Sequence, residues 1–191
     1  MSTEMHSTTS AHTAQPAIDE KSVLHRVVEG THQPRDLFGP TLEFLVLPEE
    51  AQNEFCVLRG VIPLGGSVPL HSHPPTEDFF IISGKTQALK QVAGGYEWIE
   101  MKAGDYIHVP SEERHAWRNV SSEPLVVLLI TNARLGQFFQ EAGRPVTGAP
   151  QPVTPEDLAH FLTVAAQYGH WYATPEESAA VEIRTYRVSD Q

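Results

Sequence analysis

The sequence predicts an all-β fold, a barrel or sandwich of short antiparallel strands that is followed by a helical C-terminal extension. Between residues 41 and 132, short runs rich in β-branched and aromatic residues are separated by Gly and Pro at regular intervals. Helical periodicity appears only after Arg134. The length of 191 residues, with 40% hydrophobic and 19% charged residues, suits one domain with a sizeable core.

The expected domain begins after residues 1–22, which are rich in Ser, Thr, His, Ala and Gln and indicate a disordered tail. Residues 23–134 are expected to form the barrel with its N-terminal lead-in. The strands expected there are 42–47, 55–62, 79–83, 86–91, 96–101, 106–109, 115–120 and 125–131. Gly94 and Gly95 separate two of these runs and predict a hairpin turn, because glycine adopts positive φ easily. Since no helix is expected between the strands, we expect antiparallel pairing.

Residues 135–191 are expected to form a helical extension that packs on the barrel. Apolar residues recur at helical spacing from Leu135, and Gly143 marks the end of that helix. A second helix is expected to start at Thr154, where a capping residue precedes a proline and two acidic residues, and the same signal recurs at Thr174. The apolar stripe expected on the second helix consists of Leu158, Phe161, Leu162, Ala165 and Ala166, and the helix is expected to end at Gly169. Service as a lid or as a dimer contact is the alternative role for these helices.

Charge and composition exclude several classes of partner. The chain has 24 acidic and 13 basic residues and a formal net charge of −11, whereas nucleic-acid binding needs clustered Lys and Arg. The longest unbroken apolar run, residues 125–130, is far too short to cross a membrane. No secretory signal is visible, and the single cysteine, Cys56, excludes a disulfide within the chain. We therefore expect a cytoplasmic protein with neither a nucleic-acid nor a membrane partner.

Three histidines and one glutamate carry the clearest chemical signal. His71 and His73 are two residues apart, so their side chains point to the same face of an extended segment. A turn through the two prolines that follow can return Glu77 to that face, and His115, which opens a later strand, is available as a fourth ligand. Imidazoles and a carboxylate that converge on an open site suit a divalent first-row metal.

The spacing of these residues resembles the first motif of the cupin superfamily, G-x5-H-x-H-x3-E-x6-G, which is matched at every fixed position from Gly65 to Gly84. The second motif, G-x5-P-x-G-x2-H-x3-N, is matched by Gly104, Pro110, His115 and Asn119. Glu112 replaces the glycine of that second motif, so we expect the loop 111–114 to take a different backbone path. The resemblance covers about residues 40–132 and implies a double-stranded β-helix, or jelly-roll barrel, with a metal site.

Within the superfamily, a single barrel followed by helices resembles the quercetinase-like dioxygenases. This resemblance implies cleavage of a flavonol-like or other enolisable aromatic substrate with O2. It also implies one divalent iron, manganese, nickel or cobalt ion, held by His71, His73, Glu77 and His115, with Glu77 taking the hydroxyl proton of the substrate. By strand alternation, the expected substrate pocket includes Phe79, Ile81 and Trp117. Cupin barrels often pair through sheet edges, so a homodimer is expected.

Two other functions stay open at this point. A metal-dependent isomerase, lyase or decarboxylase could use the same ligands on a small polar substrate, and a non-enzymatic cupin could bind a small molecule without turnover. The remaining candidate residues give weaker signals. His160 and His170 are expected at the surface, and His108 is expected to be a core or surface histidine. Cys56 is expected to be inert in the core, whereas Tyr106 could point into the barrel.

Overall fold

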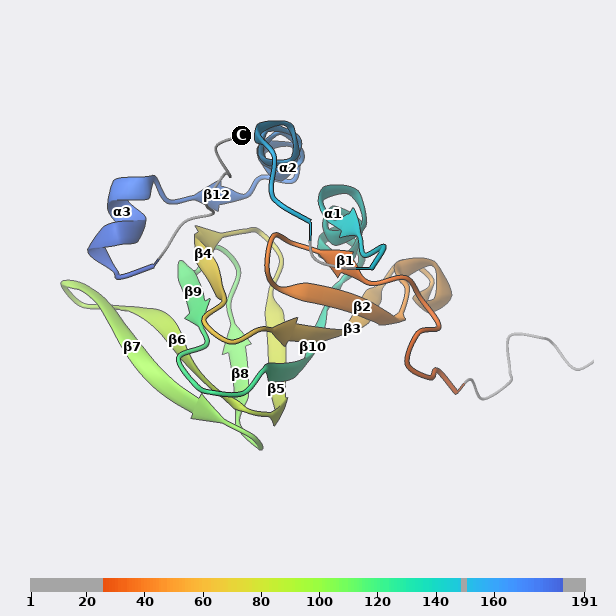
Figure 1. Ribbon diagram of the computed structural model, residues 1–191, viewed down its shortest axis with the longest axis horizontal. Helices are drawn as coiled ribbons and strands as arrows, with labels where there is room; N and C mark the ends of the chain where they lie inside the picture. The colour runs from red at the N-terminus through yellow and green to blue at the C-terminus, as the bar shows by residue number, and fades with distance from the viewer. Residues whose placement is uncertain (1–25, 149–150, 184–191) are drawn as a thin grey trace, which may run out of the picture.

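The computed structural model describes residues 26–148 and 151–183, and within them two antiparallel sheets enclose the main hydrophobic core (Figure 1). The expected all-β barrel with a helical extension at its C-terminal end is therefore confirmed. The tail expected over residues 1–22 lies outside the described residues.

The strand order in each sheet is given for the described part of the chain. The larger sheet has the order β11–β1–β2–β3–β10–β5–β8. Its strands are β11 (Arg144–Pro145), β1 (Arg35–Asp36), β2 (Thr41–Val46), β3 (Phe55–Ile62), β10 (Leu125–Asn132), β5 (Glu77–Ser83) and β8 (Tyr106–Val109). The smaller sheet has the order β12–β4–β9–β6–β7. Its strands are β12 (Trp171–Tyr172), β4 (Ser67–Ser72), β9 (His115–Arg118), β6 (Lys85–Val92) and β7 (Gly95–Lys102).

The predicted strands are all present, with bounds shifted by at most two residues, whereas β1, β4, β11 and β12 lie outside the predicted ranges. Alternation decides which side chains enter the core: Leu125, Val127 and Leu129 are buried at every second position of β10. The predicted hairpin joins β6 to β7. Val92 pairs with Gly95, so the turn consists of residues 93–94 and begins one residue earlier than expected.

The helices follow the last long strand and gather along one side of the sheets in Figure 1. They are α1 (Ala133–Ala142), α2 (Pro155–Gln167) and α3 (Pro175–Ala180). The start signals act as predicted, because Thr154 accepts a hydrogen bond from the Asp157 backbone N–H at 3.1 Å and Thr174 accepts one from that of Glu177 at 3.2 Å. A short 3-10 helix, Pro48–Ala51, connects β2 to β3.

The buried face of α2 differs from the predicted stripe. Phe161, Val164 and Ala165 are buried, whereas Leu162 is 47% exposed and Ala166 is also exposed. The physical reason is that α2 packs mainly against α1 and the segment before β2 rather than directly against a sheet. The Phe161 ring contacts Phe38 at 5.3 Å and Phe138 at 5.8 Å between centroids, which rotates the buried face toward Val164.

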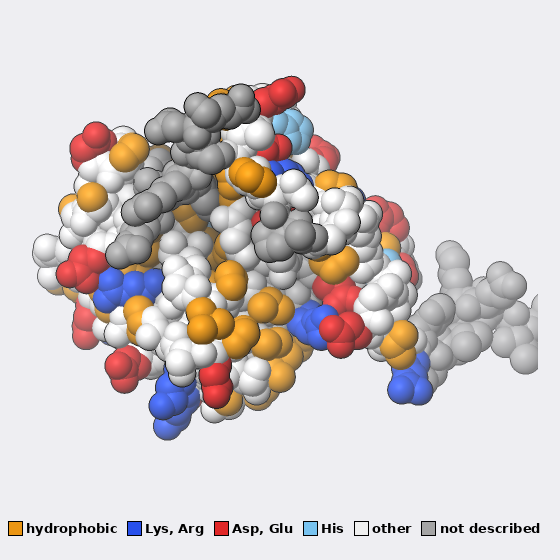
Figure 2. Space-filling view, viewed as in Figure 1, with side chains coloured by type: hydrophobic (Ala, Val, Ile, Leu, Met, Phe, Trp, Pro, Cys, Tyr) orange, Lys and Arg blue, Asp and Glu red, His pale blue; other side chains and the backbone are white. Residues whose placement is uncertain are grey.

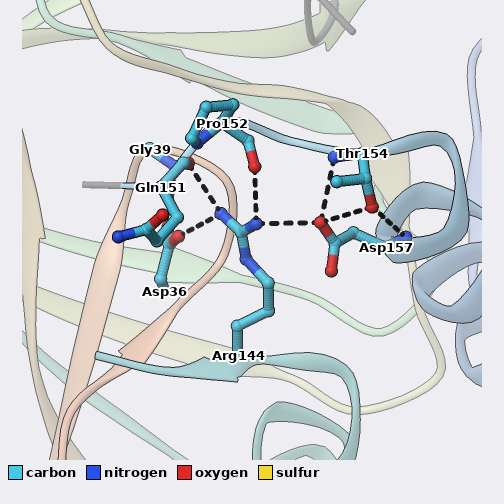
Figure 3. Close-up of polar contacts among 7 residues, drawn as sticks. All are labelled: Asp36, Gly39, Arg144, Gln151, Pro152, Thr154 and Asp157. Carbon is cyan, nitrogen blue, oxygen red and sulfur yellow. Dashed lines mark hydrogen bonds and ion pairs between the residues drawn. The ribbon is translucent and has the colours of Figure 1, made fainter. Parts of the chain in front are cut away.

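Arg144 ties the start of α2 to the edge of the larger sheet (Figure 3). Its Nη2 donates to Asp36 Oδ2 at 2.6 Å, and its Nη1 donates to Asp157 Oδ2 at 2.9 Å. The guanidinium also donates to the carbonyl oxygens of Pro152 and Gln151, at 3.0 and 3.3 Å. Because Asp157 is also the capping-box partner of Thr154, one carboxylate serves both the helix start and this clamp.

The surface charge agrees with the composition. Figure 2 shows few and scattered Lys and Arg side chains on the face in view, with Asp and Glu around its rim. This face therefore lacks, among its described residues, the clustered basic patch that a polyanion would need. Among the described helices, none combines the length and apolar character that a membrane span requires.

Candidate metal centre

Three buried histidines come together at one end of the barrel. His71 lies in β4, His73 follows that strand, and His115 opens β9, where it pairs directly with His71 across the sheet. The centroid of the His71 ring is 4.3 Å from that of His115 and 5.4 Å from that of His73. Each ring offers one nitrogen, and these ligand atoms all lie within 4.8 Å of one another. The alternation expected for His71 and His73 thus brings both to the face that carries His115.

Backbone carbonyl groups fix the orientation of all three rings. The Nδ1 atoms lie at hydrogen-bonding distance from carbonyl oxygens, at 2.8 Å for His71 and Pro69, 2.7 Å for His73 and Pro75, and 2.9 Å for His115 and Glu113. Because a carbonyl oxygen can only accept, each Nδ1 carries a hydrogen in this arrangement. In the neutral ring the lone pair is then on Nε2, which is the nitrogen available to a metal ion.

Glu77 approaches the same cluster from the other sheet, because it is the first residue of β5. Its Oε2 lies 3.2 Å from His73 Nε2 and 3.3 Å from His115 Nε2. Burial alone would raise the pKa of Glu77, but the neighbouring imidazoles outweigh it and hold that pKa well below its usual value. Burial likewise opposes the protonation of His73, yet the Glu77 carboxylate raises the pKa of His73 above its ordinary value. Burial, reinforced by the two other histidines, lowers the pKa of His71.

His115 provides the test of whether these residues fit a metal ion. Its Nε2 is buried and has no hydrogen-bond partner among the described residues, because the contact with Glu77 lacks hydrogen-bond geometry. A buried nitrogen lone pair without a partner, aimed at two further imidazoles and a carboxylate, matches the nitrogen and oxygen donors that first-row divalent ions take. His71, His73 and His115 could therefore hold a metal ion.

A cavity of about 90 Å³ opens directly beside the histidines. Phe79 and Trp117 line it, with their ring centroids 4.8 Å apart, as do Phe138 and Phe161 from the helices. Ile81 is fully buried and lies in the core instead of among the residues that line the cavity. The walls are largely aliphatic and aromatic, so the polar groups are concentrated near the histidine cluster.

Comparison with known proteins agrees with this geometry. Residues 58–131, which include all four clustered side chains, match the family model of the cupin domain. The barrel has the cupin fold. The crystal structure of a predicted oxalate decarboxylase from Thermotoga maritima superposes with a TM-score of 0.50 at 24% identity, over 56% of this chain and 98% of that one. The polyketide cyclase RemF from Streptomyces resistomycificus gives 0.53 at 15% identity, over 74% of this chain and 99% of that one. These two likenesses concern the fold alone.

A similarity in sequence extends beyond the cupin domain itself. Quercetin 2,3-dioxygenase from Bacillus subtilis (strain 168) is 28% identical over 134 residues, which make up 69% of this chain. The match covers 39% of that protein, so the chain spans about two fifths of the length of the curated relative.

The C-terminal extension contributes to the wall of the cavity, and here the structure corrects a prediction. His170 does not lie free at the surface: it lines the cavity, with its ring centroid 4.0 Å from that of Phe138 and 5.2 Å from that of His73. Both of its ring nitrogens are buried without a hydrogen-bond partner among the described residues, and burial lowers the pKa of His170 to about 4. Tyr172 lines the same wall. No sequence motif predicts a site role for either residue. Both lie at the site because β12 pairs with β4, which is distant in the sequence.

The other candidate residues lie outside the centre. His108 is exposed, with Nδ1 2.7 Å from Asp78 Oδ1, and Tyr106 is 61% exposed and donates to the same carboxylate, so Tyr106 does not enter the barrel. His160 is exposed, as expected. Cys56 is fully buried, and burial together with two nearby carboxylates raises the pKa of its thiol to about 12, which agrees with an inert core cysteine.

The loop that carries Glu112 places this residue in a conformation that glycine favours. Glu112 has a φ of +63°, in the left-handed region. Its backbone N–H donates to the carbonyl oxygen of His73 at 2.9 Å. This hydrogen bond explains why the loop keeps a conformation that is unfavourable for glutamate, since it joins the loop to the segment that carries His73.

Proposed function

We propose that this cupin domain is a metal-dependent dioxygenase that cleaves a flavonol-like or other enolisable aromatic substrate with O2. The observation that carries the proposal is the arrangement of three histidines and Glu77 beside a cavity with aromatic walls. The similarity to a quercetin 2,3-dioxygenase over 69% of the chain supports the reaction class.

In this proposal His71, His73, Glu77 and His115 hold one divalent iron, manganese, nickel or cobalt ion. When bound, such an ion supplies Lewis acidity that lowers the pKa of a coordinated enol or phenol and brings it close to dioxygen. The carbonyl groups that hold the three Nδ1 atoms keep the rings in a single tautomer and orientation. The imidazole side chains therefore lose little conformational entropy when the ion binds.

Glu77 acts as the base. Its carboxylate stays ionised among the imidazoles and has two oxygen atoms, so it can accept the hydroxyl proton of the substrate as well as bind the ion. Neutral His71, His73 and His115 cannot take this role through the nitrogen that binds the ion. Phe79 and Trp117 would contact the aromatic part of the substrate and exclude water from the reacting atoms.

The size of the cavity favours one second candidate, a metal-dependent isomerase, lyase or decarboxylase. The volume of about 90 Å³ is below the several hundred Å³ typical of ligand pockets, which suits a small substrate. Its largely apolar walls, however, offer few partners for a polar one, so the dioxygenase remains the preferred proposal. A cupin that binds a small molecule without turnover is the third alternative.

Oxygen consumption tests the proposal. Protein loaded separately with each of the four metals is mixed with quercetin and with smaller aromatic enols, and O2 uptake and substrate loss are recorded together. The proposal predicts uptake in proportion to substrate loss. Substrate loss without uptake would indicate the isomerase or lyase class, and saturable binding without either would indicate a binding protein.

The variant Glu77→Gln tests the assignment of the base. We expect it to keep more metal than a histidine variant, because the amide oxygen can still coordinate, and to lower turnover by about 100-fold or more. His160→Ala, on the exposed face of α2, serves as the matched control. Unchanged turnover in Glu77→Gln would refute the role of Glu77 as base.

A further inference from the structure

His170 is held firmly in the wall of the cavity by backbone contacts. It follows Gly169 after the end of α2, and its backbone N–H donates to the Ala165 carbonyl oxygen at 2.9 Å. The two residues after it form β12, in which Trp171 pairs with Ser72 of β4. The backbone position of His170 is therefore fixed from both sides along the chain.

The ring itself has no polar partner although its polar atoms are buried. Both nitrogens are inaccessible to solvent and lack a hydrogen bond among the described residues. The Phe138 ring lies 4.0 Å and the His73 ring 5.2 Å from the His170 ring, measured between centroids. A buried donor and acceptor left without partners is unfavourable, and a catalytic role or a bound molecule is among the explanations for such groups in native proteins. A neutral ring has one N–H donor and one acceptor nitrogen to offer.

His170 differs in this respect from the other polar side chains in the wall. Outside the metal cluster, the described residues with polar side-chain groups that line the cavity are Thr41, Trp117, His170 and Tyr172. Among these four, His170 is the one with buried nitrogen or oxygen atoms that lack a partner. Most of the other lining residues are apolar, so His170 is the preferred partner for a ligand oxygen in this part of the cavity.

We infer that His170 binds the substrate by hydrogen bonding to a second oxygen atom, adjacent to the oxygen that enters the histidine cluster. His170 is a direct neighbour of His73, with ring centroids 5.2 Å apart, so a substrate whose oxygen enters the histidine cluster brings its adjacent atoms close to His170. A substrate with oxygens on neighbouring carbons, such as a hydroxyketone or a catechol, can present one oxygen to the cluster and the other to His170, whereas a single hydroxyl cannot do both. This inference rests on the proposed function for the substrate class, an enolisable aromatic molecule.

Binding of two matched ligands tests the inference without turnover. Catechol and phenol have the same ring and differ by one hydroxyl. Their dissociation constants are measured by calorimetry under argon with zinc-loaded full-length protein, for the wild type and for His170→Phe, which keeps an aromatic ring but removes both nitrogens. Metal content is measured in the same samples. His160→Phe, at an exposed histidine of α2, is the matched control.

We expect the wild type to prefer catechol, and His170→Phe to lose about three- to tenfold of that preference while its affinity for phenol and its metal content stay unchanged. His170→Gln, which keeps a donor and an acceptor, should recover part of the preference. Comparing His170→Gln with His170→Leu gives the same readout if the phenylalanine variant does not fold.

An unchanged catechol-to-phenol ratio in the folded variants would overturn the inference, as would a wild type that binds neither ligand. Loss of metal from His170→Phe would also overturn it, because His170 would then serve the ion and not the substrate. The test is independent of the reaction class. Protein that discriminates through His170 but consumes no O2 would uphold this inference while refuting the dioxygenase proposal.

Discussion

Tyr172 pairs with His71 across strands β12 and β4, and its ring stacks on the imidazole with centroids 5.3 Å apart and planes inclined by 11°. The His71 ring is thus held at its edge by the Pro69 carbonyl and on its face by an aromatic side chain from the C-terminal extension. Tyr172 also contacts Phe161 of α2, with centroids 5.4 Å apart. Tyr172 therefore places the helical extension in direct contact with the candidate metal centre.

Replacing Tyr172 should therefore weaken metal binding although Tyr172 is not proposed as a ligand. Without the stacked ring, His71 can leave its binding orientation, and we expect Tyr172→Ala to lower metal affinity about tenfold, as is typical when the support of a ligand is removed. Competition with a chromophoric chelator measures the affinity. Tyr172→Phe should behave like the wild type, and Trp171→Ala, which alters the neighbouring residue of β12, is the control. Equal affinity in all variants would show that stacking does not position His71.

Removal of a single histidine from the cluster should abolish stoichiometric metal binding. His71→Ala and His115→Ala each remove one of the imidazole ligand atoms that lie within 4.8 Å of one another, so we expect most of the metal to be lost. Elemental analysis of the purified protein gives the metal-to-protein ratio. His160→Ala, at an exposed histidine, should retain full occupancy. Full occupancy in His115→Ala would place the metal elsewhere.

Loss of the Arg144 clamp should destabilise the protein. Its charged hydrogen bonds to Asp36 and Asp157 join side chains that are 20–25% exposed, so we expect Arg144→Met to lower the free energy of unfolding by about 1–3 kcal/mol. Chemical denaturation measures the change. Arg134→Met, which removes an exposed arginine from α1, should cost less than about 1 kcal/mol. A similar effect of both variants would contradict the role of Arg144 as a clamp.

Asp157 should make stability depend on acid. Hydrogen bonds from the Thr154 backbone N–H and hydroxyl, followed by the charge of Arg144, hold the pKa of Asp157 below its usual value of 3.8. The ionised carboxylate therefore stabilises the folded state above the unfolded pKa, and this contribution is lost as the pH falls through the folded pKa. In denaturation curves between about pH 5 and pH 2, we expect Asp157→Asn to be less stable than the wild type at pH 5, with a difference that shrinks on acidification. A difference independent of pH would contradict the assignment.

The thiol of Cys56 should be unreactive in the folded protein. It is fully buried and its pKa is raised to about 12, so very little thiolate exists at pH 8. Ellman's reagent should label less than one tenth of the protein at pH 8 within minutes, and all of it in denaturant. Prompt labelling of the native protein would show that the β3 region opens readily.

The barrel and the histidine cluster could be predicted because their signals are local. Alternating apolar residues define β10 and its neighbours, and His71, His73 and Glu77 lie within seven residues of one another in the chain. His170 could not be predicted, because it reaches the cavity through a strand of two residues that pairs about a hundred positions earlier in the sequence. The buried face of α2 was misjudged for a similar reason: Phe38 and Phe138, which select Val164 over Leu162, are distant in sequence.

The position of the four clustered side chains has a consequence for the stability of the whole fold. His71 and His115 belong to the smaller sheet, whereas Glu77 opens β5 of the larger one. With Glu77 as the fourth ligand, as proposed, an ion in this centre connects the two sheets, which are not joined to each other by strand pairing among the described residues. Unfolding then requires release of the ion, so the free energy of unfolding rises with the logarithm of the free metal concentration once that concentration exceeds the dissociation constant. The free metal concentration in the surroundings would then set how stable the barrel is.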